Sequence, residues 1–258
     1  MLENERSFDE LFSEAYTAED FVLYYNSSFS DDPIFNHAVI SDDILDAEES
    51  SEEKIAAILE KVREKAKNFE VPASIFVDEF RKVASRLEKV GIEMGYRIFE
   101  KMEILSKDLD LVGPLSDNPD ILVSESSDFE TWNDVFVRSF GITESWFGEL
   151  QKRVKVLTRD PRTVLLLARE KNSSIKASGC LLLHFFPPEC GGVYSVGTLP
   201  ERRGHGVAKA LMDTAEYFAK QKGSSFVTLQ TVTSDGVRPM YLKRGYSLDF
   251  ERVILQSG

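Results

Sequence analysis

Residues Val193–Ala215, VYSVGTLPERRGHGVAKALMDTA, decide the fold of this chain. Alternating apolar residues in Val193–Val196 predict a strand, and Pro200 ends it because proline has no amide to donate to a ladder. From Val207 onward, apolar residues at spacings of three and four predict a helix. The connecting Arg202–Gly206 segment holds two arginines and two glycines. Glycines let a ligand approach the backbone, and a helix N-terminus offers unpaired amides, so this turn predicts a phosphate site.

The spacing of the turn decides which phosphate ligand it fits. Neither the dinucleotide pattern G-x-G-x-x-G nor the Walker pattern G-x-x-x-x-G-K-[ST] is present. The residues Arg203-Gly204-His205-Gly206-Val207-Ala208 read R-x-x-G-x-A. This segment resembles the acyl-CoA pyrophosphate loop, [RQ]-x-x-G-x-[GA], of the GNAT superfamily of N-acetyltransferases. The preceding Thr198–Glu201 is similar to the V-x-P-E that leads into that loop, with Thr198 in the place of valine.

The resemblance implies the residues that would bind acetyl-CoA. Main-chain groups of Val196, Gly197 and Thr198 would pair with pantetheine like an added strand. The pyrophosphate would lie on the loop residues Arg203, Gly204, His205, Gly206, Val207, Ala208 and Lys209.

A second signature follows the next predicted strand, Phe226–Thr231. Met240–Tyr246, MYLKRGY, is similar to the family element L-Y-x-[KR]-x-G-[FY]. The resemblance implies that the Tyr241 hydroxyl lies near the acyl-CoA sulfur and acts as general acid; a phenol with a pKa of about 10 suits a thiolate leaving group. The alternative is that Tyr241 is a packed helix aromatic. We expect Ser234 or Asp235 to cap this short helix and Gly245 to end it.

Other reactive side chains give weaker signals. Glu189, just before the Val193 strand, could activate an amine through water; the alternative is an exposed loop carboxylate. His184 lies in an apolar strand and is expected to be a core histidine. Cys180 and Cys190 show no signature of a disulfide framework or a nucleophile, and no metal-binding spacing occurs. We expect direct transfer rather than a covalent enzyme intermediate, with no metal.

Composition limits the environment and the partners. The chain has 258 residues, 42% apolar and 29% charged, with a net charge of −13. No apolar run approaches the roughly 18 residues of a membrane span, and the acidic N-terminus has no signal-peptide core, which together predict a cytoplasmic protein. An acidic chain is a poor ligand for nucleic acid. The expected partners are acetyl-CoA and an amine acceptor, with a homodimer as an option.

The charge is uneven, which suggests two domains. Residues 1–116 carry 13 Lys and Arg against 27 Asp and Glu, a balance of −14, and residues 117–258 have a balance of +1. The loop-forming residues 108–120 place the boundary, giving domains 1–115 and 116–258. The segment Leu87–Gly91 can be aligned with Tyr241–Gly245, which indicates a degenerate GNAT-like N-terminal domain. It has no glycine between Met1 and Val90, so we expect no phosphate loop there.

The elements complete the predicted fold. We expect one or two short helices in residues 1–30 and a helix that Gly91 stops. From residue 121 the order β–α–α–β–β–β–α–β–α–β is predicted, and the resemblance implies a mixed, mostly antiparallel α/β sheet flanked by helices, in tandem with the degenerate domain. The implied function is acetyl transfer to a primary amine of a small molecule or peptide. The alternative is a non-catalytic acyl-CoA-binding sensor module.

Overall fold

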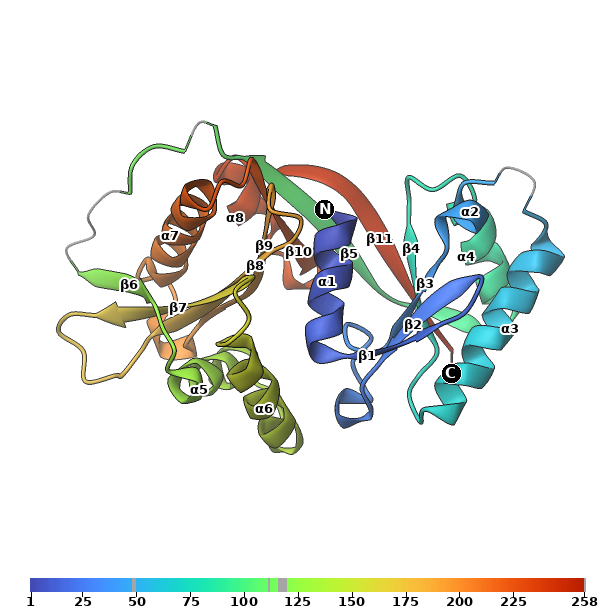
Figure 1. Ribbon diagram of the computed structural model, residues 1–258, viewed down its shortest axis with the longest axis horizontal. Helices are drawn as coiled ribbons and strands as arrows, with labels where there is room; N and C mark the ends of the chain where they lie inside the picture. Colours follow the sequence, from blue (N-terminus) through green and yellow to red (C-terminus); the bar gives the residue numbers. More distant parts are fainter. Residues whose placement is uncertain (48–49, 111, 116–119, 258) are drawn as a thin grey trace. The chain divides into compact units, whose positions relative to one another are not determined.

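The chain forms two compact units (Figure 1). The computed structural model describes residues 1–47, 50–110, 112–115 and 120–257. Unit 1 contains Met1–Leu11 and Ser106–Leu229, and unit 2 contains Phe12–Leu105 and Gln230–Gly258. Each unit has its own run of strands and its own buried apolar residues, so each is described by itself.

Unit 1 is a sheet covered on both faces by helices. Its strands lie in the order β10-β9-β8-β7-β6; β10 and β9 are parallel and the other pairs are antiparallel. Helix α7 lies on one face of β7 and β8, and α5 and α6 lie on the other (Figure 1). The bounds are α1 Leu2–Phe12, β6 Ile121–Glu125, α5 Phe129–Phe140, α6 Phe147–Leu157, β7 Thr163–Glu170, β8 Gly179–Phe185, β9 Cys190–Thr198, α7 Val207–Gln221 and β10 Phe226–Val232.

Close packing of α7 on this sheet depends on glycines. A Cβ at Gly179 would lie 2.5 Å from Cγ1 of Val207 and 2.9 Å from Cδ1 of Leu211. A Cβ at Gly191 would lie 3.1 Å from that of Ala219. Both ends of α7 are therefore fixed against the strands, which holds the loop before α7 at the end of β9.

Unit 2 is built on strands in the order β1-β2-β3-β4-β11-β5. Its core holds Leu23, Leu59, Ile75, Leu87 and Leu255, all 0% exposed. The bounds are β1 Glu14–Thr17, β2 Phe21–Tyr25, β3 His37–Ile40, α2 Asp42–Leu45, α3 Glu52–Asn68, β4 Ser74–Asp78, α4 Ala84–Glu93, β5 Tyr96–Asp108, α8 Arg238–Lys243 and β11 Ser247–Ser257. Short 3-10 turns are η1 Ser27–Phe29, η2 Glu144–Trp146, η3 Pro200–Arg202 and η4 Thr233–Asp235.

Apart from the short α2 between β3 and α3, which has no counterpart α-helix between β9 and α7, the same order of helices and strands occurs twice along the chain. The first copy is β2-β3-α3-β4-α4-β5 and the second is β8-β9-α7-β10-α8-β11. In each copy the first two strands are antiparallel and the second and third are parallel. Helices α4 and α8 occupy equivalent places, which are the segments that the sequence comparison of Leu87–Gly91 with Tyr241–Gly245 had paired. The predicted α/β fold class is confirmed, as is the element order from residue 121 onward.

The compact units cut the chain differently from the predicted division at residues 115 and 116. That boundary adjoins residues 116–119, which lie outside the described residues. Residues Met1–Leu11 join unit 1 because α1 packs on β8 and β9. Residues Gln230–Gly258 join unit 2 because β11 pairs with β4, from Arg252↔Asp78 to Gln256↔Ser74. The division into domains 1–115 and 116–258 therefore stays a prediction, and it concerns the two copies of the repeated element order.

Of the one or two short helices expected in residues 1–30, the structure has α1. Residues 14–17 and 21–25 are strands, because the β-favouring run FVLYY of β2 pairs with both β1 and β3. Two local expectations were wrong. Gly91 lies inside α4, where a Cβ would come 2.9 Å from Leu255 Cδ1. Ser234 and Asp235 form η4, and the N-cap of α8 is Val237, whose side chain makes no capping bond.

Candidate functional site

The predicted phosphate loop has an open backbone. Gly204 and Gly206 have φ values of +81° and +85°, a region that L side chains rarely adopt. Among the described residues, a Cβ at Gly204 would meet nothing within 4 Å, and one at Gly206 would meet only Ile121 Cδ1 at 4.0 Å. Both residues are exposed, so solvent or a ligand can reach the main chain of this loop.

Helix α7 starts at this loop without a side-chain cap. Its N-cap is Gly206 in the left-handed conformation, and the Ala210 amide donates to the Gly206 carbonyl over 3.0 Å. The amides of Val207, Ala208 and Lys209 precede that bond, so they have no carbonyl partner within the helix. Their shared direction, added to the helix dipole, favours an anion.

The basic side chains of the loop are partly engaged in holding it. Arg203 Nη2 donates to the carbonyl of Ser139 at the end of α5, over 2.9 Å. Arg202 lies 3.3 Å from Glu170, and Lys209 lies 2.6 Å from Asp213. The amides, rather than the arginines, are therefore the open groups of the loop.

Strand β9 changes character toward the loop. Cys190–Val193 are buried, whereas Tyr194–Val196 and Thr198 are partly exposed. The pairing with β8 shifts register between Cys180 and Leu182, and Ser195 has a φ of +55°. A shift with a positive φ at a non-glycine residue marks a bulge that re-aims the strand. The Thr198 Oγ1 is buried without a hydrogen-bond partner among the described residues, so a ligand could satisfy it.

Tyr241 belongs to unit 2, and its ring is well packed. The side chain is 7% exposed and meets Tyr246 edge to face, with ring centroids 5.8 Å apart. Burial raises the pKa of Tyr241 to about 12, so the hydroxyl keeps its proton at ordinary pH. Gly245 follows the helix with a φ of +85°, which matches its predicted place at the helix end.

The remaining candidates divide into core and surface residues. Glu189 and His205 are exposed. His184 is 0% exposed and its Nε2 lies 2.9 Å from Ser7 Oγ; burial, helped by Arg162, lowers its pKa to about 4. Cys180 and Cys190 are buried and free of disulfides. Burial raises the pKa of the Cys190 thiol to about 11, which does not suit a nucleophile.

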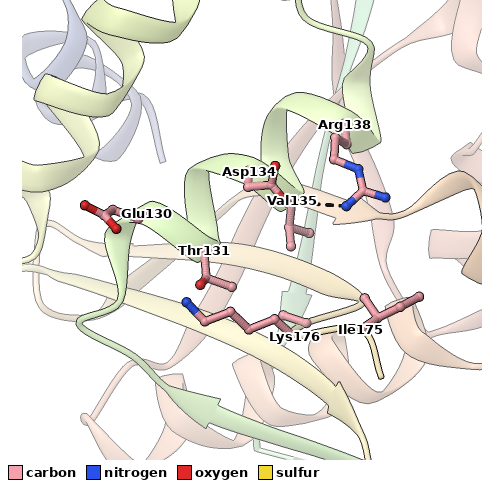
Figure 2. Close-up of a pocket in the computed structure, with 8 residues that line it drawn as sticks. Glu130, Thr131, Asp134, Val135, Arg138, Ile175 and Lys176 are labelled. Atoms are coloured by element: carbon pink, nitrogen blue, oxygen red, sulfur yellow. Dashed lines mark hydrogen bonds and ion pairs between the residues drawn. The ribbon is translucent and has the colours of Figure 1, made fainter. Parts of the chain in front are cut away.

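A groove of about 400 Å³ lies between α5 and the turn that joins β7 to β8. Figure 2 shows Asp134 and Arg138 on the helix and Lys176 and Ile175 across from them. None of the predicted site residues lines it. Arg138 also lies 2.8 Å from Glu201, just before the phosphate loop, so the groove borders the loop without containing it.

Sequence reasoning missed the part that α1 plays in unit 1. Asn4, Ser7 and Phe8 contact β8 and β9, about 180 residues away in the chain. No motif joins such distant residues, and the only sequence signal was the amphipathic pattern of the first residues. Among the described residues, no three His, Cys, Asp or Glu side chains are grouped to hold a metal ion.

Comparison with known families agrees with this geometry. Residues 124–246 match the sequence model of the acetyltransferase (GNAT) family. The matched segment contains both the phosphate loop and Tyr241. The match identifies residues 124–246 as GNAT-family sequence, and the description of that family is acetyltransferase.

Solved structures share the fold along nearly the whole chain. A GCN5-related N-acetyltransferase from Kribbella flavida has a TM-score of 0.70 at 15% identity, covering 99% of this chain and 95% of that one. A functionally unknown conserved protein from Staphylococcus epidermidis ATCC 12228 has a TM-score of 0.71 at 14% identity, covering 96% and 94%. A tandem GNAT protein from the clavulanic acid biosynthesis pathway has a TM-score of 0.63 at 12% identity, covering 92% and 78%.

No protein with a curated description matches the sequence. In the part of the chain that the structure describes, no helix is both long and apolar enough to cross a membrane.

Proposed function

We propose that this chain moves an acetyl group from acetyl-CoA to a primary amine of a small molecule or peptide, by direct attack in a ternary complex. The observation that carries the proposal is the uncapped start of α7, where Gly204 and Gly206 leave the main chain open. A pyrophosphate is the ligand whose charge and size suit several amides that point the same way.

The proposal assigns separate parts of acetyl-CoA to separate residues. The amides from Gly204 to Lys209 would bind the pyrophosphate, with Arg203 and His205 beside it. Main-chain groups of Val196, Gly197 and Thr198 would pair with pantetheine, and the Thr198 hydroxyl, which has no partner among the described residues, would gain one. No metal is required by this scheme.

Tyr241 would protonate the departing CoA thiolate. When the amine attacks the thioester carbon, a C–N bond forms, the C–S bond breaks and the amine loses a proton. The Tyr241 hydroxyl, with its pKa held at about 12, would donate its proton or a hydrogen bond to the sulfur. Glu189 is the sequence candidate for the base. Its exposed place before β9, seven residues from Val196, favours the alternative of a loop carboxylate, so the proton of the amine would pass to water.

Continuous measurement of CoA release tests the function. The full chain with acetyl-CoA should release CoA when a panel of primary amines is added, and tertiary amines of similar size should give no release. Calorimetry on the same preparation should show one acetyl-CoA site per chain. Binding without release for every amine would remove the transferase and leave a binding module.

That binding module is the second candidate, and the burial of Tyr241 favours it. A ring that is 7% exposed and packed on Tyr246 could have a purely structural part. A sensor would bind acetyl-CoA through the same loop, and CoA release separates the two functions directly.

The acceptor is proposed to be cationic. The balance of −14 in residues 1–116 would attract an ammonium group by long-range steering. The KM for the amine should then rise with ionic strength. An amine KM that stays constant with added salt would remove this preference and leave the transfer reaction untouched.

A further inference from the structure

Strand β9 lies between β8 and β10 and yet opens to solvent at Tyr194–Val196. An interior strand of a sheet with helices on both faces is normally covered throughout. Here the opening coincides with the bulge at Ser195, whose φ is +55°. It comes directly before the Val196–Thr198 segment that is proposed to hold pantetheine, so the thioester would be placed at this opening.

Helix α1 lies on the face of β9 opposite to α7. A Cβ at Gly191 would point to Ala219 of α7, at 3.1 Å, whereas one at Gly192 would lie 2.1 Å from Asn4 Oδ1 of α1. Successive strand residues point to opposite faces. Since the proposed cofactor loop begins α7, the face that carries α1 is the one left for the acceptor amine.

Asn4 connects α1 to both strands through its buried amide. The side chain is 0% exposed, and its Nδ2 donates to the His184 carbonyl over 2.9 Å and toward the Cys190 carbonyl over 3.4 Å. This fixes Oδ1 as the acceptor for the Tyr194 hydroxyl, at 2.8 Å. The missing side chain of Gly192 provides the space for Asn4.

Two further contacts fix the position of α1 on the strands. Phe8 stacks on the Tyr194 ring with centroids 3.7 Å apart and planes 1° from parallel. Ser7 Oγ lies 2.9 Å from His184 Nε2 and accepts from Arg162 Nη1 at 3.2 Å. Tyr194 is thus held at its ring and at its hydroxyl, one residue before the bulge.

We propose that Asn4 is a positioning residue for acyl transfer, which fixes Tyr194 and through it the bulge at Ser195. The inference rests on the proposed function. Asn4 acts on the strand before the bulge, and the proposed acetyl-CoA contacts follow it. Loss of Asn4 should therefore disturb the placement of the reacting atoms and leave cofactor affinity unchanged. A misplacement of about 1 Å at reacting atoms can cost about 10²-fold in rate.

The test is a double-mutant cycle with Asn4→Ala and Tyr194→Phe, read by kcat, by the calorimetric Kd for acetyl-CoA and by thermal unfolding. Asn4→Ala should lower kcat by about 10²-fold with the Kd within about twofold of wild type. Tyr194→Phe removes only the hydroxyl and should reproduce most of that loss. The double variant should be no slower than Asn4→Ala, because both changes remove one contact. Glu3→Ala, on the exposed side of the same helix, is the control and should keep wild-type kinetics.

Several results would overturn the positioning role. The two losses could add independently, Tyr194→Phe could turn over at full speed, or the Kd could rise in step with the fall in kcat, as a structural role predicts. Tyr194→Phe decides the matter alone if Asn4→Ala does not fold. A wild-type chain that binds acetyl-CoA and releases no CoA overturns the proposed function itself, and the positioning role with it. An active wild type with an equally active Asn4→Ala overturns the positioning role only.

Discussion

Helices α3 and α7 follow equivalent strands in the two copies of the fold, and their N-termini have opposite chemistry. At α3, the Ser51 hydroxyl accepts from the Lys54 amide over 3.2 Å, and Glu52 and Glu53 occupy the first turn. At α7, Gly206 provides no side-chain cap, and the first turn has no acidic residue. The connection before α3 includes residues 48–49, which lie outside the described residues, so the comparison concerns the helix starts.

The difference shows two ways in which the unpaired amides at a helix N-terminus can obtain hydrogen-bond acceptors. A serine hydroxyl and two carboxylates supply α3 with the acceptors and negative charge that its amides and dipole favour. Helix α7 leaves the same groups open, which is what an anionic ligand requires. The N-terminal copy therefore has its own side chains where the C-terminal copy is proposed to bind a phosphate, and one acetyl-CoA site per chain is expected.

The largest effect is expected from closing the open helix start. Gly206→Val places a branched side chain beside the amides of α7, and acetyl-CoA affinity should fall by more than about 10²-fold, equivalent to about 3 kcal/mol. Gly223→Val is the matched control, because Gly223 follows the C-terminus of α7 with a φ of +91° and open space around it. Both variants carry positive-φ strain, of order 1–3 kcal/mol.

Calorimetry and thermal unfolding on the two glycine variants separate strain from binding. Gly223→Val should lose stability and keep its acetyl-CoA affinity. A folded Gly206→Val chain with wild-type affinity would show that the phosphate is bound elsewhere, and the contrast between α3 and α7 would then have no functional meaning.

The next largest effect concerns Tyr241, whose counterpart in the N-terminal copy is Leu87. Tyr241→Phe keeps the packed ring and removes the hydroxyl, so kcat should fall by about 10²–10⁴-fold while acetyl-CoA affinity stays near wild type. Because burial raises the pKa of Tyr241 to about 12, the hydroxyl stays protonated through pH 10, and its ionisation should cause no loss of rate below that pH. A phenylalanine variant with undiminished kcat would leave Tyr241 as a packing residue, as Leu87 is.

A smaller effect, on stability, is expected from removing the Ser51 N-cap of α3. Ser51→Ala removes the hydroxyl that accepts from Lys54 and should lower the free energy of unfolding by about 1 kcal/mol. Ser41→Ala is its control, since Ser41 is the N-cap of α2 without a side-chain bond. Both variants should keep wild-type acetyl-CoA affinity, measured beside urea unfolding. Equal losses in the two variants would mean that the Ser51 cap contributes nothing to α3.

Local sequence predicted the backbone conformation at Gly204 and Gly206 and did not predict which distant strands pair, for a physical reason. Gly204 and Gly206 could be predicted because positive φ and open main chain are properties that glycine alone provides freely. The Asn4–Tyr194 contact joins residues 190 positions apart, and each of them is unremarkable in its own segment. Strand β11 likewise pairs with β4, a partner that no local pattern selects. Pairing between distant segments is decided by tertiary packing. The repeat was therefore visible in the sequence, but the assignment of Met1–Leu11 to unit 1 and of Gln230–Gly258 to unit 2 was not.

The smallest effect is expected at the other end of β9, where Glu189 precedes the strand. The proposed phosphate loop follows the C-terminal end of β9, and about 20 Å of strand, at roughly 3.3 Å per residue, separates Glu189 from Val196. Its side chain is exposed, and its backbone carbonyl is the part that the fold uses, accepting from the Ser225 amide over 2.8 Å. A carboxylate at that distance could reach the amine only through several waters.

Glu189→Gln keeps the shape and removes the charge, so kcat/KM should stay within about threefold of wild type. The pH–rate profile provides the decisive measurement. An acidic limb that disappears in Glu189→Gln, with a fall in kcat of about 10²-fold or more, would identify Glu189 as the base and place the acceptor amine near the start of β9 instead of at its bulge.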